Sequence, residues 1–313
     1  MTISGLPARS GAATDHQRTK HAVNLDDVQM TILTEAEWRD RRAAHEERVD
    51  AWTAEHLRRR QRGDKHPVED FLFTYYSHRP QQLRRWQPGA GVALQGAAPD
   101  EFGPYYVRDG AGDLHVDVDA LRSRRRDSIT WTSTLLRGTA ARPAHFGCFG
   151  MHEWAMVYRQ SADDIRHAEW PLRLTSAETD AVVDANRVRC SHFDAFRFFT
   201  PPARPLNLLV PTRESQPDLD QPGCLHANMD LYKFAYKLSP ITPSELVADC
   251  FALAREIRTL DMRASPYDLA GLGLDPVPVE TPEGRAEYAR HQQQFAEKAA
   301  PLRSRLIEIC AGY

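Results

Sequence analysis

The sequence lacks several patterns that would place a protein in a familiar class. It has no run of about 20 apolar residues, so no membrane-spanning helix is predicted. Its 5 cysteines are scattered and form no Cys-x-x-Cys pair, which argues against a disulfide framework and against a cysteine zinc site. Dinucleotide-binding, P-loop and nucleophile-elbow motifs are also missing. These absences favour a reducing cytoplasm as the compartment and leave the common nucleotide and hydrolase classes without their usual support.

An excess of one charge is missing as well. The net charge is −3 at pH 7, so a strongly basic surface for nucleic acid is not predicted in bulk, although local patches remain open. The 313 residues are enough for a substantial buried core. Residues 1–30 are polar, and they show neither helical periodicity nor the apolar core of a secretory signal. We therefore expect a flexible leader over 1–30 and a single globular catalytic domain over 31–313.

Helix starts are well marked along the chain. Thr34 and Glu37 form a capping box, which predicts a helix over 35–62. Three further helix starts have the same kind of signal: Thr175 (to about Asn186), Thr242 (with Pro243 as the first helical residue) and Thr281 (with a break expected near Pro301). The segment from His226 to Lys237 is also predicted to be helical.

Strand signals lie between these helices. Residues 113–119 alternate cleanly between polar and apolar, and residues 188–199 alternate less strictly but are rich in aromatic side chains. Residues 87–112 and 200–224 are rich in Pro and Gly and are predicted loops. The expected fold class is therefore α+β: a helix-rich single domain with flanking helices around a small central β-sheet.

Four segments place a histidine beside a carboxylate. They are His66 with Asp70 (and the adjacent Glu69), His152 with Glu153, His192 with Asp194, and His226 with Asp230. His226 and Asp230 are four residues apart in a predicted helix and so share a face. His192 and Asp194 are two residues apart in a predicted strand and would also point the same way. Pro67 makes His66 the predicted cap of a helical turn.

Imidazoles and carboxylates together suit a divalent transition metal such as iron, manganese or zinc. The predicted metal ligands are His192, Asp194, His226, Asp230, His66 and Asp70. His152, Glu153 and Arg263 are the predicted catalytic residues, with Arg263 as a donor fork for an anion. An open metal position would activate water or dioxygen for a small-molecule substrate. Two alternatives stay open: the same groups could act as metal-free acid/base pairs, or each pair could be a structural ion pair.

Three stretches carry a family resemblance: residues 66–80 (HPVEDFLFTYYSHRP), 150–158 (GMHEWAMVY) and 224–233 (CLHANMDLYK). They resemble bacterial, mostly actinobacterial, proteins commonly labelled 3-methyladenine DNA glycosylase, over most of the chain from about residue 34. The resemblance implies removal of alkylated bases, with DNA as the partner. In that interpretation the polar residues line a base pocket, and the basic clusters Arg58–Arg62 or Arg122–Arg126 bind phosphates.

Overall fold

The computed structural model describes residues 30–161 and 170–312. Helices make up 58% of it and accompany a small mixed sheet, which confirms the helix-rich α+β class. The predicted leader over 1–30 lies outside the described residues except for Met30.

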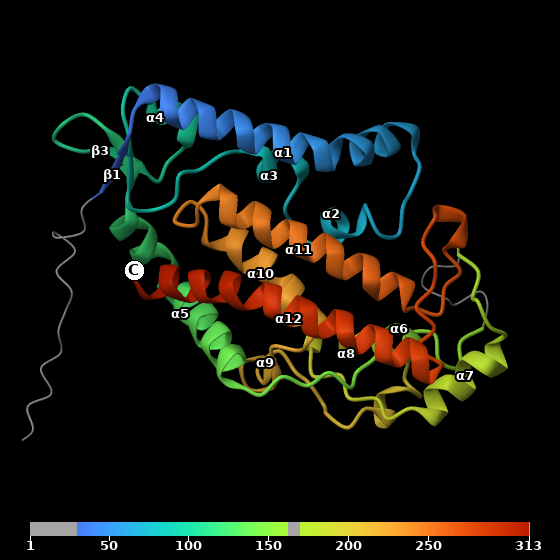
Figure 1. The fold of residues 1–313 in the computed structure, drawn as a ribbon. Helices are drawn as coiled ribbons and strands as arrows, with labels where there is room; N and C mark the ends of the chain where they lie inside the picture. The colour runs from blue at the N-terminus through green and yellow to red at the C-terminus, as the bar shows by residue number, and fades with distance from the viewer. Residues whose placement is uncertain (1–29, 162–169, 313) are drawn as a thin grey trace, which may run out of the picture.

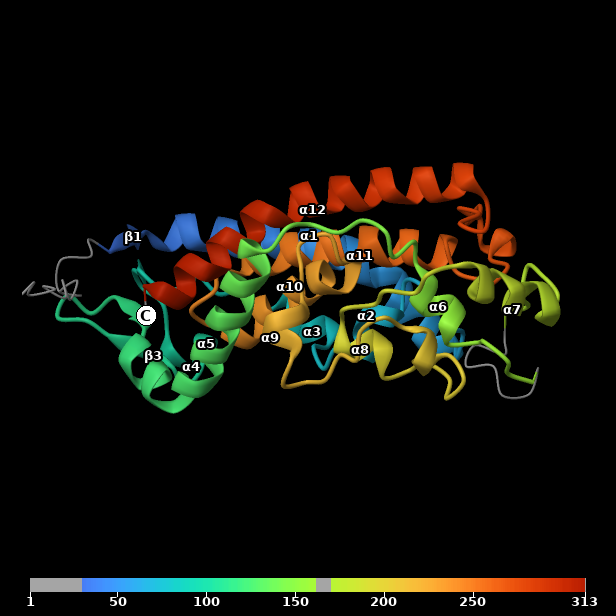
Figure 2. The same cartoon turned by 90° about the horizontal axis from the view of Figure 1, so that it is seen from below.

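Five long helices form the body of the molecule: α1 (Glu35–Arg62), α5 (Val118–Ala141), α10 (Leu225–Leu238), α11 (Ser244–Arg263) and α12 (Pro282–Ala311). In Figures 1 and 2, α1, α11 and α12 run along the length of the molecule. Helix α10 packs against α11 and α12, and α5 packs against α12. Ten of the 14 residues of α10 are buried, so this helix lies at the centre of the core and can hold polar groups away from water.

Local sequence signals explain where most of these helices begin. The predicted capping box of α1 is present: the Glu37 backbone N–H donates to Thr34 Oγ1 at 3.4 Å, and the Thr34 N–H donates to Glu37 Oε2 at 2.8 Å. Helix α7 (Ser176–Ala185) has the same box at Thr175. Helix α11 departs from the prediction. It begins at Ser244 after Pro243, and Glu245 accepts from the Trp86 indole instead of closing a box with Thr242.

The C-terminal helix also differs from expectation. Helix α12 runs without interruption from Pro282 to Ala311, with Pro301 inside it. The residues around Pro301 include Ala299 and Arg303, which are buried against the rest of the core. Tertiary packing therefore holds this helix together across a residue that removes one hydrogen bond.

The sheet lies at one end of the helical body (Figure 1). Its strands are β1 (Thr31–Leu33), β2 (Val92–Leu94), β3 (Tyr106–Arg108) and β4 (Leu114–Val116), in the order β1-β2-β4-β3. Strand β1 is parallel to β2, and the other pairs are antiparallel. Strand β4 confirms the strand signal within 113–119. The predicted loop over 87–112 holds β2, β3 and the short helix α4 (Pro99–Phe102).

The remaining described elements are short. They are α2 (Phe71–Tyr75), α3 (Pro80–Arg84), α6 (Met151–Ala155), α8 (Phe193–Phe196) and α9 (Gln216–Leu219), with the 3-10 turns η3 (Arg204–Leu206) and η4 (Ala270–Leu272). The prediction of a strand over 188–199 is wrong. This segment enters extended and then turns into α8, with His192 as the residue before the helix. The Phe196 N–H donates to the His192 carbonyl at 3.0 Å, so a helical turn replaces the ladder bonds of a strand.

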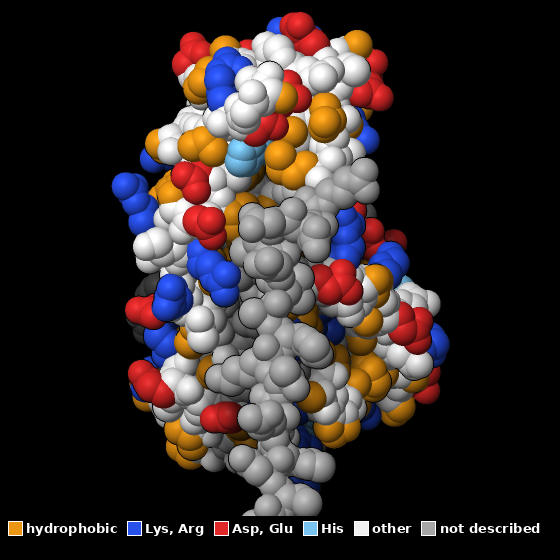
Figure 3. Space-filling model, turned by 90° about the vertical axis from the view of Figure 1, so that its left-hand side faces the viewer, with side chains coloured by type: hydrophobic (Ala, Val, Ile, Leu, Met, Phe, Trp, Pro, Cys, Tyr) orange, Lys and Arg blue, Asp and Glu red, His pale blue; other side chains and the backbone are white. Residues whose placement is uncertain are grey.

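The end of the molecule that carries the sheet is shown in Figure 3, where acidic and basic side chains are interspersed with apolar ones. Ile32 and Val107, on the two edge strands, are among the apolar side chains exposed in the described residues. Of the helices in the described ranges, none has the length and apolar character needed to cross a membrane.

Candidate metal centre

The short helix α6 and the long helices α10 and α11 bring two histidines and an aspartate together in the core. His152 comes from α6, His226 from the first turn of α10 and Asp261 from the last turn of α11. One ligand atom from each residue lies within 4.8 Å of the other two. A tetrahedral metal with bonds of about 2.0 Å needs ligand atoms about 3.3 Å apart, so small rotations of these side chains would suffice. Among the described residues, this is the group that could hold a metal ion.

The turn before α6 aims His152 into the core. Phe149 and Gly150 both have positive φ, at 45° and 69°. Glycine adopts this conformation readily, but phenylalanine does so at a cost of about 1–3 kcal/mol. A Cβ at Gly150 would lie 3.4 Å from the Tyr288 ring, so the backbone passes close to α12 here. The surrounding packing therefore maintains a strained turn directly before the first candidate ligand.

The two histidines of the cluster have different electrostatic surroundings. His152 Nε2 lies 2.8 Å from Asp261 Oδ1. Burial disfavours the imidazolium, but the Asp261 carboxylate outweighs it and raises the pKa of His152. Burial and the neighbouring His152 together hold the pKa of His226 well below its usual range. His226 is therefore a neutral imidazole at physiological pH, which is the form that binds metals.

Asp261 is held by a buried arginine as well as by His152. Arg258 Nη1 lies 3.1 Å from Asp261 Oδ2 and donates to Glu153 Oε1 at 2.9 Å. The Arg258 guanidinium also lies 3.7 Å from the centroid of the Phe71 ring. Removing charges from water is costly unless they are paired, and here Arg258 contacts both carboxylates while His152 also pairs with Asp261. The cluster therefore has a free imidazole, His226, and carboxylates whose orientation is set by Arg258.

A second polar network lies on the other side of His226. His192 stacks on His226 at 5.3 Å between ring centroids, and His192 Nε2 lies 3.3 Å from Asp230 Oδ2. Tyr76 donates to Asp230 Oδ1 at 2.9 Å, and Lys233 also bonds Asp230. Burial opposes the ionisation of Asp230, yet Lys233 and His192 hold the pKa of this carboxyl group well below its usual range. The network therefore contains an ionised carboxylate with its partners already in place.

A cavity of about 320 Å³ reaches this centre. Its wall includes His226, Glu153 and Arg258 together with aromatic and apolar side chains, namely Phe71, Tyr75, Met156, Ala195 and Phe198; Thr74, Asp194 and Arg197 complete it. The side chain of Asp194 is tied to Arg197 at 3.1 Å and to Lys233 at 3.6 Å. His226 and Glu153 are thus the groups of the candidate centre that a molecule in this cavity would meet.

The structure places the predicted site residues in separate locations. His152, Glu153 and His226 lie at the centre described above. His192 and Asp230 form the adjacent network, and Asp194 lines the cavity. The predicted partnership of His226 with Asp230 is replaced by that of His226 with His152 and Asp261.

His66, Asp70 and Arg263 lie away from this centre. Asp70 accepts from the His66 backbone N–H at 2.8 Å, while its other oxygen bonds His56 and Arg59. His66 caps a turn as predicted, because its Nδ1 accepts from Glu69 N at 3.1 Å. His66 Nδ1 and both carboxylate oxygens of Asp70 thus have partners within the protein, and the two residues are not part of a group of described residues that could hold a metal ion. Arg263 donates to the Asp275 carbonyl at 2.7 Å, so it fastens a loop instead of facing an anion in the cavity.

Asp261 and Arg258 are the site residues that the sequence analysis missed. The signal was present in the helix that contains them. Cys250, Ala254 and Ile257 define the buried face of α11, and Arg258 and Asp261 continue that face at helical spacing. A charged residue on a buried face needs a partner, which marks it as a candidate for a site.

The two predicted basic clusters also differ from each other. In the first, Arg58, Arg59 and Arg62 are paired with Glu55, Asp70 and Asp64 respectively. In the second, Arg124, Arg125 and Arg126 line a cleft of the protein.

The chain matches no family model, no curated protein and no solved structure.

Proposed function

We propose that this chain is a metal-dependent enzyme that acts on a small molecule. His152, His226 and Asp261 would hold a divalent transition metal, and the position facing the cavity would stay open for water or dioxygen. The observation that carries the proposal is the convergence of these three ligand atoms within 4.8 Å beside a cavity. Two histidines and one carboxylate with open positions are typical of non-haem iron sites, and zinc hydrolases use a similar set.

The residues around the three ligands have separate roles in this proposal. Glu153 lines the cavity, and the bond from Arg258 fixes its carboxylate, so it is placed to accept a proton from a bound water. Arg258 also orients Asp261. A metal in this position would supply Lewis-acid activation of the bound water or oxygen. The cavity volume of about 320 Å³ lies at the small end of ligand pockets and favours a small substrate with an apolar or planar part.

Metal uptake tests this proposal directly. The purified protein would be stripped of metal, incubated separately with Fe²⁺, Mn²⁺ and Zn²⁺, and its metal content measured by elemental analysis. We expect one equivalent in the wild type, and at least about 100-fold weaker binding in His226→Ala and Asp261→Asn, because each loses a direct ligand. His66→Ala is the matched control, since His66 is a half-buried histidine beside another carboxylate.

The result that contradicts the proposal is equally direct. If the wild type takes up none of these metals, or if His66→Ala loses metal as His226→Ala does, the centre is not a metal site. The close His152–Asp261 pair would then be the group left to act as a metal-free acid/base.

A second candidate is the base-excision activity implied by the resemblance. The aromatic side chains Phe71, Tyr75 and Phe198 around the cavity support it, because a flipped base stacks between planar rings. Release of 3-methyladenine from alkylated duplex DNA, measured by chromatography, tests this candidate. Release that persists in Glu153→Gln and His226→Ala would assign the activity to a contaminant, and no release from the wild type would remove the candidate.

A further inference from the structure

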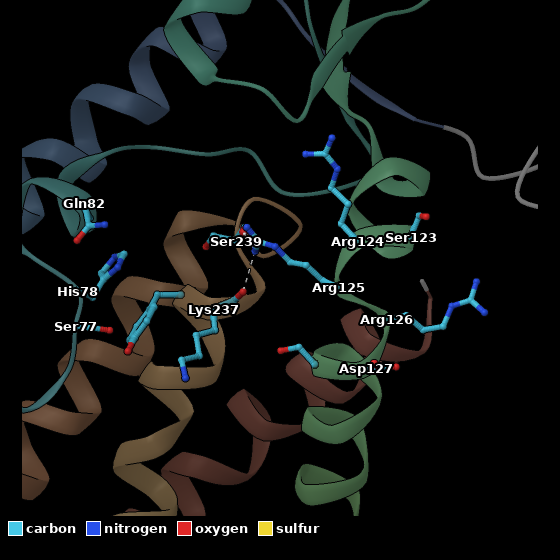
Figure 4. A pocket seen from close by; sticks show the side chains of 12 residues that line it. Ser77, His78, Gln82, Ser123, Arg124, Arg125, Arg126, Asp127, Lys237 and Ser239 are labelled. Atoms are coloured by element: carbon cyan, nitrogen blue, oxygen red, sulfur yellow. Dashed lines mark hydrogen bonds between the residues drawn. The ribbon is translucent and has the colours of Figure 1, made fainter.

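A second, larger cleft lies at the opposite end of α10 from the metal centre. Its volume is about 970 Å³, and it lies between the C-terminal end of α10, the first turns of α5 and residues 77–82 (Figure 4). Lys237 and His226 are 11 residues apart on α10, which is about 16 Å along the helix. The cleft is therefore separate from the cavity that reaches His226, and the proposed metal chemistry does not use it.

A break in helix α5 brings cationic side chains to this cleft. Arg125 has non-helical angles (φ −122°, ψ 15°) inside α5. Its Nη1 donates to the carbonyls of Lys237 and Ser239 at 3.2 and 3.0 Å, so the arginine ties the kink to the end of α10. In Figure 4, Arg125 points toward Ser239, Lys237 comes from the facing helix, and Arg124 and Arg126 point away from Lys237 in different directions. Lys237, Arg125 and Arg124 thus line the same cleft from two facing helices.

The cationic side chains that line the cleft outnumber the acidic ones. Asp127 is the acidic residue among the described lining residues, and no ion pair joins Lys237, Arg124 or Arg125 to a carboxylate within 30–161 and 170–312. Desolvation and the positive charge of Lys233 lower the pKa of Lys237, and the carboxylates of Asp230 and Asp194 only partly oppose this shift. Lys233 is four residues away on the same helix face, and like charges at this spacing repel. An anion bound here would relieve that repulsion.

One wall of the cleft consists of aromatic rings. His78 stacks on Tyr236 with ring centroids 4.4 Å apart and planes at 12°. Burial lowers the pKa of His78 to about 4, so the ring is neutral at physiological pH and adds no charge to the wall. Ser77, Ser123, Ser128 and Gln82 supply neutral hydrogen-bonding groups around it. The cleft therefore combines a planar neutral wall with three cations on its other sides.

We propose that this cleft binds a nucleotide unit. The phosphates would contact Lys237, Arg124 and Arg125, since charge-assisted bonds to phosphate oxygens are the strongest contacts available here. The planar base would lie against the His78–Tyr236 pair, because aromatic side chains provide a stacking surface that tolerates any base. A free nucleoside triphosphate and one unit of a single strand share this chemistry, and the cleft volume accommodates either.

Equilibrium binding of ATP, tripolyphosphate and a deoxythymidine decamer to the full-length protein tests this inference. At an ionic strength of about 0.15 M, we expect Lys237→Gln and Arg124→Gln to weaken ATP binding about 10-fold each, because each removes a charge-assisted contact. Arg122→Gln is the matched control, since it removes the same charge from the same helix outside the cleft. His78→Ala should weaken ATP binding but leave tripolyphosphate binding unchanged.

The arms of the experiment separate the possible results. Competition between the decamer and ATP, with tighter decamer binding, would identify a strand as the source of the nucleotide, and ATP binding without decamer binding would identify the free nucleotide. Absence of ATP and decamer binding overturns the proposal, as does an equal loss of affinity in Arg122→Gln and Lys237→Gln. Equal binding of ATP and tripolyphosphate, unaffected by His78→Ala, overturns the assignment of a nucleotide. Binding that survives in His226→Ala shows that the cleft works independently of the metal centre.

Discussion

The two ends of helix α10 place histidines in opposite electrostatic surroundings. Near its N-terminal end, His226 lies between a cluster with Asp261 and a network with Asp230, and buried cations neutralise both carboxylates. At its C-terminal end, Tyr236 stacks on His78 in a cleft whose cations have no carboxylate partner within the described ranges. Burial keeps both histidines neutral. The difference indicates that charge at the first end is satisfied within the protein, whereas charge at the second is available to a ligand.

The largest effect is expected from removing a buried cation near the N-terminal end of α10. Arg258→Met should lower the free energy of unfolding by about 3–5 kcal/mol, because it leaves Glu153 buried without its cation and leaves Asp261 with only His152 as a cationic partner. Urea denaturation followed by tryptophan fluorescence measures the change. Arg197→Met is the control; Arg197 is 45% exposed beside Asp194, so about 1 kcal/mol or less is expected. Similar losses in the two variants would contradict the claim that burial makes the difference.

An intermediate effect is expected from the protonation of His78. Its pKa in the folded protein is about 4, against an ordinary value of 6.5, so the unfolded chain binds more protons between these values. The neutral ring therefore contributes stability that is present above pH 6.5 and is lost as the pH falls toward 4. The expected loss is about 1–3 kcal/mol, since part of the ring is exposed to solvent.

The measurement for His78 is the free energy of unfolding at several pH values between 4.5 and 7.5. His78→Gln removes the titrating group, so its stability should fall less over this range than that of the wild type. Parallel curves for the two proteins would show that His78 is not held neutral by the fold.

The smallest effect is expected at Lys237, and its size distinguishes the two ends of α10. Lys237→Gln should change the free energy of unfolding by about 0.5 kcal/mol or less, because Lys237 is exposed and its repulsion from Lys233 is opposed by attraction to Asp230 and Asp194. Lys233→Met is the comparison; it should destabilise by about 3 kcal/mol, since it leaves Asp230 buried without its cation. Thermal unfolding at low salt measures both changes. Destabilisation by Lys237→Gln as large as that by Lys233→Met would indicate that Lys237 has a structural partner.

The sequence predicted those parts of the fold that depend on neighbouring residues. The capping boxes at Thr34 and Thr175 involve residues three apart, and most of the long helices and β4 lie where periodicity placed them. The prediction missed the long helix α5 and expected a break in α12 that is absent. It also failed where distant contacts decide. Residues 188–199 have the aromatic content of a strand, but no neighbouring strand pairs with them in the described structure, and His192 instead begins α8. Alternation is a weak signal when it is not strict, because packing partners decide between the alternatives.

The candidate site divides in the same way. By itself, the sequence determined that histidines and carboxylates lie in apolar segments, and this was enough to single out His152, Glu153 and His226. The tertiary structure alone decided which carboxylate each histidine meets. Asp261 is 109 residues from His152, and only the packing of α6 and α10 against the end of α11 brings them to 2.8 Å. The physical reason is that a buried polar group must find a partner wherever the fold supplies one, and sequence distance does not limit that choice.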